Sequence, residues 1–398
     1  MKIHSDDYQT LFNQGNTQQN SGHLTQAIES YDKALQIGPD DHLAWYNRGN
    51  ALNDLGRNLE AIVSYDKTLQ IQPDYPPAWN NRGIALRKLG RHLEAVESYD
   101  KALKIQANYH QAWYNRGIAL DHLSRHEHAI ESDDQALQIQ PDDHQTWNNR
   151  GLALYHLGRF TEAIENYDHA LQLQPNDQQT WNNRGLALEK AGHFVEAVES
   201  YDKALQLQPH FHAAWNNRGL ALDELGHHEQ AIESYDKALQ IQPDFHAAWN
   251  NRGLTLYNLG HFEEAIESYD KALQFEPDLH QAWYNRGNAL DDLDRHQEAV
   301  ENYDQALQIK PDSFEAWNNR GAALEDLGQH ESAIESYNNA LQIKPDLYDA
   351  WNNRGIVLGT LGRFDEAIPS FDNALQIKPD YELAQKNRQL AIKKREDS

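Results

Sequence analysis

The chain contains no cysteine, and its only methionine is the first residue. Disulfide frameworks and thiolate metal sites are therefore excluded. No run of 18 apolar residues occurs, so no membrane-spanning helix is predicted. The first eight residues include no apolar stretch resembling a secretory signal. We therefore expect a soluble cytoplasmic protein that needs no metal or other cofactor.

Basic side chains are also scarce, with 35 Lys and Arg against 61 Asp and Glu and a formal net charge of −26. Such a charge repels phosphate backbones, and the chain lacks the basic stripe of nucleic-acid-binding proteins. It favours neutral or basic polypeptides as partners. We therefore expect a protein or an extended peptide as the partner, and neither nucleic acid nor membrane.

What the chain has in abundance is repetition. All ten tryptophans lie on one lattice with a period of 34 residues, at positions 45, 79, 113, 147, 181, 215, 249, 283, 317 and 351. A fixed period between 20 and 50 residues is typical of stacked supersecondary units. Frames of this length give eleven units over residues 8–381, preceded by a leader, 1–7, and followed by a capping helix and tail, 382–398. Little chain remains for a catalytic domain, so we expect no enzyme.

One unit, residues 212–245, illustrates the local pattern. Apolar or small residues follow three- and four-residue spacing over its first half, and a second such run follows a glycine and ends at a proline. This spacing predicts two antiparallel helices joined by a short turn. One unit cannot bury its own apolar face, so neighbouring units must stack.

The pattern resembles the tetratricopeptide repeat over most of the chain. In this unit the matching residues are Trp215, Gly219, Ala231, Tyr235, Ala238 and Pro243. The resemblance implies an all-α fold, a right-handed α-solenoid of eleven helix-turn-helix units with a C-terminal capping helix. The Asn-Arg-Gly block after the aromatic residue is similar to the bacterial, particularly cyanobacterial, type of the repeat.

An arginine stands three residues after each tryptophan, and an aspartate stands 16 residues before nearly every such arginine. The chain ends decide the pairing. If each arginine met the aspartate of its own unit, Arg388 would have no partner, whereas pairing with the preceding unit leaves only Asn338 as an exception. We therefore predict ion pairs between neighbouring repeats, because a guanidinium near a helix interface needs a partner.

An asparagine stands two residues after each tryptophan, although asparagine is a poor residue for helix interiors. The resemblance implies that first helices line a concave groove that holds ligands. An amide can bind one peptide unit through a donor and an acceptor. This asparagine ladder resembles the ladder in the repeat domain of O-linked N-acetylglucosamine transferase, whose catalytic domain is missing here. The candidate peptide-binding residues are Asn47, Asn81, Asn115, Asn149, Asn183, Asn217, Asn251, Asn285, Asn319 and Asn353.

Two alternatives remain open for these positions. The asparagines could instead hydrogen-bond to one another along the groove. Five residues after the tryptophan, central units carry apolar residues, which fit either hydrophobic anchors for a peptide or ordinary packing between helices: Ile84, Ile118, Leu152, Leu186, Leu220 and Leu254.

The favoured function is a non-catalytic protein-protein interaction scaffold that binds an extended polypeptide segment. A separately encoded substrate-recruiting or regulatory subunit of an enzyme, such as a glycosyltransferase or protease, is an alternative, as is a self-assembling structural rod. The identity of the partner and the oligomeric state do not follow from the sequence. Histidines one repeat apart would lie about 10 Å from each other, too far to share a metal ion.

Four departures from the pattern fall in two places. Ala107 replaces the closing proline, Ser124 and Asp294 replace turn glycines, and Asp133 replaces the inward-facing aromatic residue. By analogy with large-to-small core substitutions, Asp133 leaves a packing deficit of about 3 kcal/mol. We therefore predict that the fourth unit is the least stable part of the array.

Overall fold

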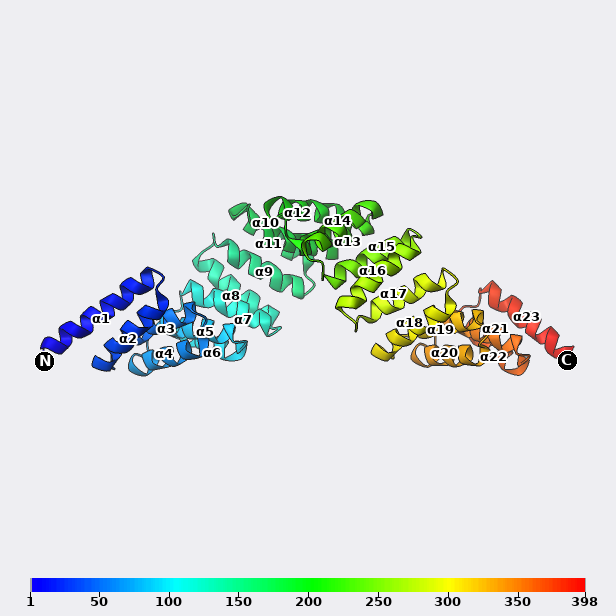
Figure 1. Ribbon diagram of the computed structural model, residues 1–398, viewed down its shortest axis with the longest axis horizontal. Coiled ribbons are helices and arrows are strands. Elements are labelled where there is room, and N and C mark those ends of the chain that lie inside the picture. The colour runs from blue at the N-terminus through cyan, green and yellow to red at the C-terminus, as the bar shows by residue number, and fades with distance from the viewer. Residues whose placement is uncertain (1, 398) are drawn as a thin grey trace. The chain divides into compact units, whose positions relative to one another are not determined.

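The computed structural model describes residues 2–397, and this range consists of 23 α-helices without any strand (Figure 1). Helices with odd numbers up to α21 are the first helices of the repeats. They are α1 (Lys2–Asn20), α3 (His42–Asp54), α5 (Pro76–Lys88), α7 (His110–His122), α9 (His144–His156), α11 (Gln178–Lys190), α13 (His212–Glu224), α15 (His246–Asn258), α17 (His280–Asp291), α19 (Phe314–Asp326) and α21 (Tyr348–Thr360).

Helices with even numbers are the second helices, and one further helix closes the array. They are α2 (Leu24–Ile37), α4 (Asn58–Ile71), α6 (His92–Ile105), α8 (His126–Ile139), α10 (Phe160–Leu173), α12 (Phe194–Leu207), α14 (His228–Ile241), α16 (Phe262–Phe275), α18 (His296–Ile309), α20 (His330–Ile343), α22 (Phe364–Ile377) and α23 (Glu382–Glu396).

The chain divides into two compact units, residues 1–207 with α1–α12 and residues 208–398 with α13–α23. Within each unit, a first helix packs against the second helix of its own repeat, and that second helix packs against the first helix of the next repeat. This stacking confirms the predicted all-α solenoid. Helix α1 begins at Lys2, so the segment expected to be a leader continues into the first helix.

A close approach between the two helices of each repeat explains the glycine four residues after the tryptophan. A Cβ atom added to Gly219 would stand only 2.5 Å from a ring carbon of Tyr235, so no larger residue fits there. The tyrosine ring and the alanines around it are fully buried. Tyrosine or phenylalanine fills this place in every described repeat but one, at Tyr31, Tyr65, Tyr99, Tyr167, Tyr201, Tyr235, Tyr269, Tyr303, Tyr337 and Phe371.

The turn between paired helices needs a left-handed backbone conformation, which glycine adopts at little cost. Turn glycines such as Gly226 have φ values between 70° and 81°. Ser124 and Asp294 adopt a φ of 56° at the equivalent places, so these two turns keep the same path with residues that disfavour it.

Each tryptophan joins neighbouring repeats through a hydrogen bond that its spacing does not reveal. The indole Nε1 of Trp215 donates to the carbonyl of Pro209, six residues earlier, at 2.9 Å. At Trp113 the acceptor is the carbonyl of Ala107, so the absence of the closing proline does not remove the bond. In α23, Gln385 replaces the tryptophan and donates through Nε2 to the carbonyl of Pro379 at 2.8 Å.

Candidate functional site

The arginines three residues after each tryptophan bind the preceding repeat, as predicted from the chain ends. Arg82 Nε donates to Asp66 Oδ1 at 2.7 Å, and Arg82 Nη1 donates to Ser98 Oγ at the same distance. The second acceptor lies in the same repeat as the arginine, and sequence reasoning missed it. We call each such group of an arginine and its two acceptors an arginine rung. Equivalent rungs are Asp32–Arg48–Ser64, Asp100–Arg116–Ser132, Asp134–Arg150–Asn166, Asp168–Arg184–Ser200, Asp236–Arg252–Ser268, Asp270–Arg286–Asn302 and Asp304–Arg320–Ser336.

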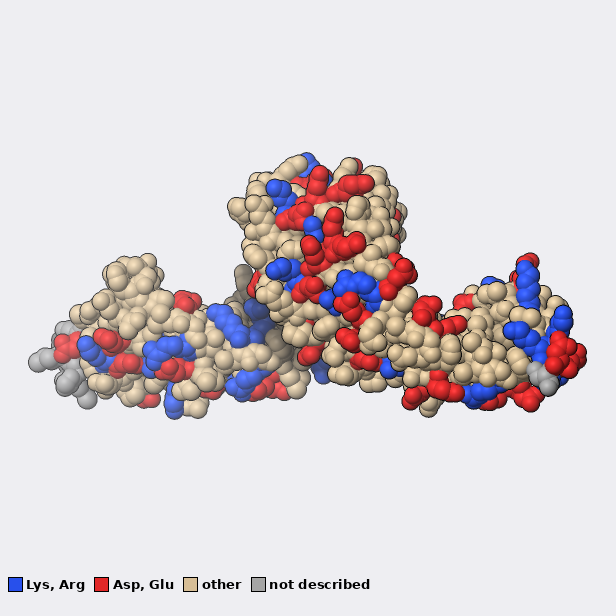
Figure 2. Space-filling model, turned by 45° about the vertical axis from the view of Figure 1, so that its right-hand side comes forward, with Lys and Arg blue, Asp and Glu red and all other residues tan. Residues whose placement is uncertain are grey.

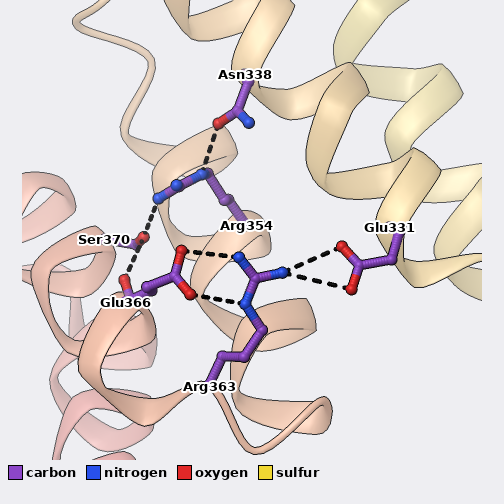
Figure 3. Close-up of polar contacts among 6 residues, drawn as sticks. All are labelled: Glu331, Asn338, Arg354, Arg363, Glu366 and Ser370. Atoms are coloured by element: carbon purple, nitrogen blue, oxygen red, sulfur yellow. Dashed lines mark hydrogen bonds and ion pairs between the residues drawn. The ribbon is translucent and has the colours of Figure 1, made fainter.

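The rung at Arg354 has an amide in place of the carboxylate. Its Nε donates to Asn338 Oδ1 at 2.7 Å and its Nη1 to Ser370 Oγ at 2.5 Å (Figure 3). Burial lowers the pKa of this guanidinium, and the nearby charge of Arg363 lowers it further. Arg363 itself binds both Glu366 and Glu331 (Figure 3). The rungs fix how repeats stack, so their role is structural.

The asparagine ladder lies on the first helices, α3 to α21, of both units. Eight of the ten predicted residues are partly exposed, whereas Asn115 and Asn183 are buried, with 7% and 9% exposure. The ladder is therefore more enclosed than a freely accessible row of amides. Its hydrogen bonds fall into two patterns.

In the first pattern, a ladder amide donates to the asparagine that follows the tryptophan of the preceding repeat. Asn115 Nδ2, for example, lies 3.2 Å from Asn80 Oδ1. The same bond joins Asn183 to Asn148, Asn251 to Asn216, and Asn387 to Asn352. These contacts match the alternative in which the asparagines bind one another.

In the second pattern, the amide donates to the residue five after the preceding tryptophan or its equivalent. Asn81 Nδ2 lies 2.9 Å from Asn50 Oδ1 and 3.0 Å from the Tyr46 hydroxyl. Asn319 repeats this arrangement with Asn288 and Tyr284, and Asn47 donates to Asn16. This pattern appears where the preceding repeat has an asparagine five residues after its tryptophan, or after Leu11 in the first repeat.

Three ladder residues make neither bond. Within the described residues, Asn285 and Asn353 donate to no side chain of the preceding repeat, and Asn149 Nδ2 makes no hydrogen bond of normal geometry but lies near the Tyr114 hydroxyl. The oxygens that the first pattern would use, Asn250 Oδ1 and Asn318 Oδ1, are buried without a partner. Asn285 and Asn353 therefore keep an unused side-chain donor, whereas Asn353 Oδ1 already accepts from Asn352. Asn217 is partly exposed on α13 and accepts from Asn216 at 3.4 Å.

The apolar positions beside the ladder are mostly half-buried. Ile84 packs against the hydrophobic core of the first unit, as expected for helix packing. Leu254 is the most exposed of the six predicted residues, with 38% of its surface accessible. Packing between helices therefore accounts for Ile84, whereas Leu254 has surface that this packing leaves accessible.

One group of side chains has donor atoms close enough for a cation. Asp291, His296 and Asp326 each place a donor atom within 4.8 Å of the other two. His296 Nδ1 lies 2.7 Å from Asp291 Oδ1, and this pair raises the pKa of the imidazole. The same aspartate–histidine pair recurs at Asp121–His126 and Asp223–His228, so it is a local feature of the helix turn. We assign no metal to it.

The surface carries acidic groups with fewer basic groups among them, which Figure 2 shows on one face. The net charge of −26 makes this the dominant long-range field of the chain. No helix among the described residues combines the length and apolarity that crossing a membrane requires.

The sequence matches family patterns over nearly its whole length. The family described as tetratricopeptide repeat matches residues 76–109, 144–177, 179–211, 212–245, 246–279, 280–313, 314–347 and 348–381. A second tetratricopeptide repeat family matches residues 110–143, and a family described as TPR repeat matches residues 15–56 and 49–90.

One of the similar solved structures aligns with a TM-score above 0.5 and shows the same fold. A tetratricopeptide repeat protein from Parabacteroides merdae aligns with a TM-score of 0.51 and 19% identity, over 63% of this chain and 99% of that one. YrrB, described as a TPR protein with an unusual peptide-binding site, aligns with a TM-score of 0.44 and 23% identity, over 48% and 99%. MamA aligns with a TM-score of 0.40 and 27% identity, over 40% and 94%. No curated protein matches the sequence.

Proposed function

Because this chain belongs to the tetratricopeptide repeat family, we propose that it is a non-catalytic scaffold that binds an extended polypeptide segment along the asparagine ladder. Membership of this family supports a role in protein-protein interaction. The extended shape of the partner and the use of the ladder are our proposal.

The observation that carries the proposal is the regular placement of one amide per repeat, together with the unused donors of Asn285 and Asn353. Neighbouring packed helices lie about 8–10 Å apart, and an extended chain rises about 3.3 Å per residue. One ladder residue per repeat would therefore meet about every third residue of a bound segment. An amide that binds a peptide unit reads no side chain, so the ladder suits many sequences.

The hydrogen bonds within the ladder indicate which of its residues would bind a peptide. The donors of Asn115, Asn183 and Asn251 already serve the preceding repeat, whereas those of Asn285 and Asn353 do not. We therefore assign the strongest contacts in the second unit to Asn285 and Asn353. The acidic surface adds a preference for neutral or basic segments.

A test uses peptides selected from a displayed random dodecapeptide library against the full chain. The variant Asn285→Ala with Asn353→Ala should bind about 30-fold more weakly, since two peptide hydrogen bonds contribute about 1 kcal/mol each. The matched control is Asn251→Ala with Asn319→Ala, whose amides serve the preceding repeats. It should lower stability more than affinity.

Equal affinity of the wild type and the Asn285 and Asn353 double variant would remove the ladder from the proposal. Purification of the chain from its native cells then separates the other functions. A single co-purifying enzyme would indicate a recruiting subunit, and recovery of the chain alone as a polymer would indicate a structural rod.

A further inference from the structure

The fourth repeat carries a carboxylate in the place that an aromatic ring fills in the other described repeats. Asp133 on α8 is 1% exposed, and neither of its carboxylate oxygens has a hydrogen-bond partner. Buried polar groups in folded proteins are nearly always hydrogen-bonded, so a fully buried, unpartnered carboxylate requires a specific explanation.

The missing ring leaves a cavity of ≈ 80 Å³ beside Asp133. This volume exceeds the share of one water molecule in the liquid, about 30 Å³. Its walls come from three helices: Ile118 and His122 on α7, Asp133 on α8, and Asn149 and Leu152 on α9. Of these lining residues, His122 is exposed.

A second polar group, Asn149 Nδ2, lines the same cavity and makes no hydrogen bond of normal geometry. The ninth repeat explains why it is unpartnered. There Asn288 accepts hydrogen bonds from both the Tyr303 hydroxyl and Asn319 Nδ2. In the fourth repeat the residue equivalent to Asn288 is Ile118, which offers no acceptor to Asn149. The Asn149 amide lies close enough to Tyr114 to counteract the burial that raises the pKa of that hydroxyl.

The charges around the cavity favour a cation. Burial raises the pKa of Asp133, and the carboxylates of Asp121, Asp134 and Asp143 raise it further, while Arg150 opposes them. Arg150 is already bound to Asp134 at 2.8 Å. Asp121 and Asp143 each lie beside a histidine, His126 at 2.7 Å and His110 at 3.2 Å. A cation placed at Asp133 would favour the deprotonated carboxylate and would interact with it strongly, because the site has low polarity.

We propose that this cavity accepts the basic side chain of a lysine or an arginine, with Asp133 as its counter-ion and Asn149 donating to a carbonyl of the same ligand. Ile118 and Leu152 line the cavity and offer apolar contact to the alkyl part of such a side chain. A cation beside Asp133 would offset the cost of a buried, deprotonated carboxylate. The delivery of this side chain by an extended segment rests on the proposed function, because Asn149 is a ladder residue.

The test uses n-butylammonium and methylguanidinium chloride as probes for the two side chains, and n-butanol as the uncharged equivalent. Each is added to the full chain, and hydrogen exchange of α7, α8 and α9 is followed by mass spectrometry. We expect a cation to slow exchange there and n-butanol to leave it unchanged. The cation that slows exchange at the lower concentration identifies the preferred side chain, lysine for n-butylammonium and arginine for methylguanidinium.

Two variants control for the charge and for the space. Asp133→Asn keeps the cavity without its charge, and Asp133→Tyr fills it with the residue found in the other repeats. Both should weaken the apparent affinity for the cation at least tenfold. Exchange in α17 and α18, where Tyr303 fills the equivalent place, serves as the internal control and should not respond.

Equal protection by n-butanol, undiminished protection in Asp133→Asn, or no protection by any cation in the wild type would overturn the inference. A matched pair of dodecapeptides, with lysine or norleucine at the central position, separates it from the proposed function. If butylammonium binds but the lysine peptide binds no better than the norleucine peptide, delivery of the side chain by a segment bound to the ladder is refuted while the cation site stands.

Discussion

The fourth repeat, residues 110–143, and the ninth, residues 280–313, offer a natural comparison. Both open with His-Gln-Ala-Trp-Tyr-Asn-Arg-Gly, and both replace the turn glycine, by Ser124 and Asp294. Both form an aspartate–histidine pair at 2.7 Å after the first helix. Among the positions at which they differ, Asp133 and the half-buried Ile118 stand against Tyr303 and Asn288.

The comparison teaches that the residues at these two positions decide whether the space between the paired helices is filled or left as a cavity. In the ninth repeat, Asn288 Oδ1 accepts hydrogen bonds from the Tyr303 hydroxyl and from Asn319 Nδ2, and the tyrosine ring fills the space between the helices. In the fourth, the same backbone leaves a cavity with two unpartnered polar groups. The turn substitutions are shared, so they do not cause the difference.

The largest expected effect comes from giving the ninth repeat the carboxylate of the fourth. Tyr303→Asp should lower the free energy of unfolding of that region by about 3–5 kcal/mol, because it removes a buried ring and leaves a cavity. It also removes the donor to Asn288. Chemical unfolding combined with hydrogen exchange of α17 and α18 measures the loss.

The reverse change provides the control for this prediction. Asp133→Tyr should slow hydrogen exchange in α7 and α8, and adding Ile118→Asn should slow it further by giving the new hydroxyl an acceptor. In the wild type, α7 and α8 should exchange faster than α17 and α18. Equal exchange in the two repeats would contradict the expected weakness of the fourth.

A smaller effect should depend on pH. The pKa of Asp133 is raised by burial first and by Asp121, Asp134 and Asp143 next, with Arg150 acting against them. The folded state therefore holds this proton to higher pH than the unfolded state does. Stability of the wild type relative to Asp133→Asn should be greatest below the unfolded pKa, near about 3.9, and fall as the pH rises through the raised value.

The decrease in the free energy of unfolding measures how far the folded pKa of Asp133 lies above its unfolded pKa, at about 1.4 kcal/mol for each pKa unit. Urea unfolding of the wild type and of Asp133→Asn between acidic and neutral pH measures it. Exchange in α17 and α18 is the reference, because Tyr303 replaces the carboxylate there. A constant difference between the two proteins over this range would show that Asp133 does not carry a raised pKa.

The smallest effect should be the same in both repeats. Ser124→Gly and Asp294→Gly each relieve a left-handed conformation with a φ of 56°. We expect each to raise the free energy of unfolding by up to about 1 kcal/mol, since glycine adopts this conformation freely but gains entropy when unfolded. Thermal unfolding of the single variants measures it, and unequal gains would show that the two turns differ beyond their shared backbone.

Much of the fold could be predicted because the period of 34 residues states directly which residues share a helix face. The direction of the arginine rungs also followed from the sequence, because only one pairing gives Arg388 a partner at the chain end. The bond from Arg82 to Ser98 was missed, although the recurrence of serine or asparagine 16 residues after each arginine is a usable signal.

The ladder shows where prediction from the sequence stops. All its members occupy the same position of the repeat, yet Asn115 binds Asn80, Asn81 binds Asn50 and Tyr46, and Asn149 has no partner. The partner of each amide depends on two positions of the preceding repeat at once. A pattern that treats every repeat alike cannot separate these cases.

The sequence by itself determined the helix pairs, their stacking order and the residues that face the neighbouring repeat, because periodicity places side chains on helix faces. Only the tertiary structure decided which of these side chains have hydrogen-bond partners. Hydrogen bonding depends on distances of a few tenths of an ångström between atoms of different repeats, and the same amide is used at Asn115 and left open at Asn149.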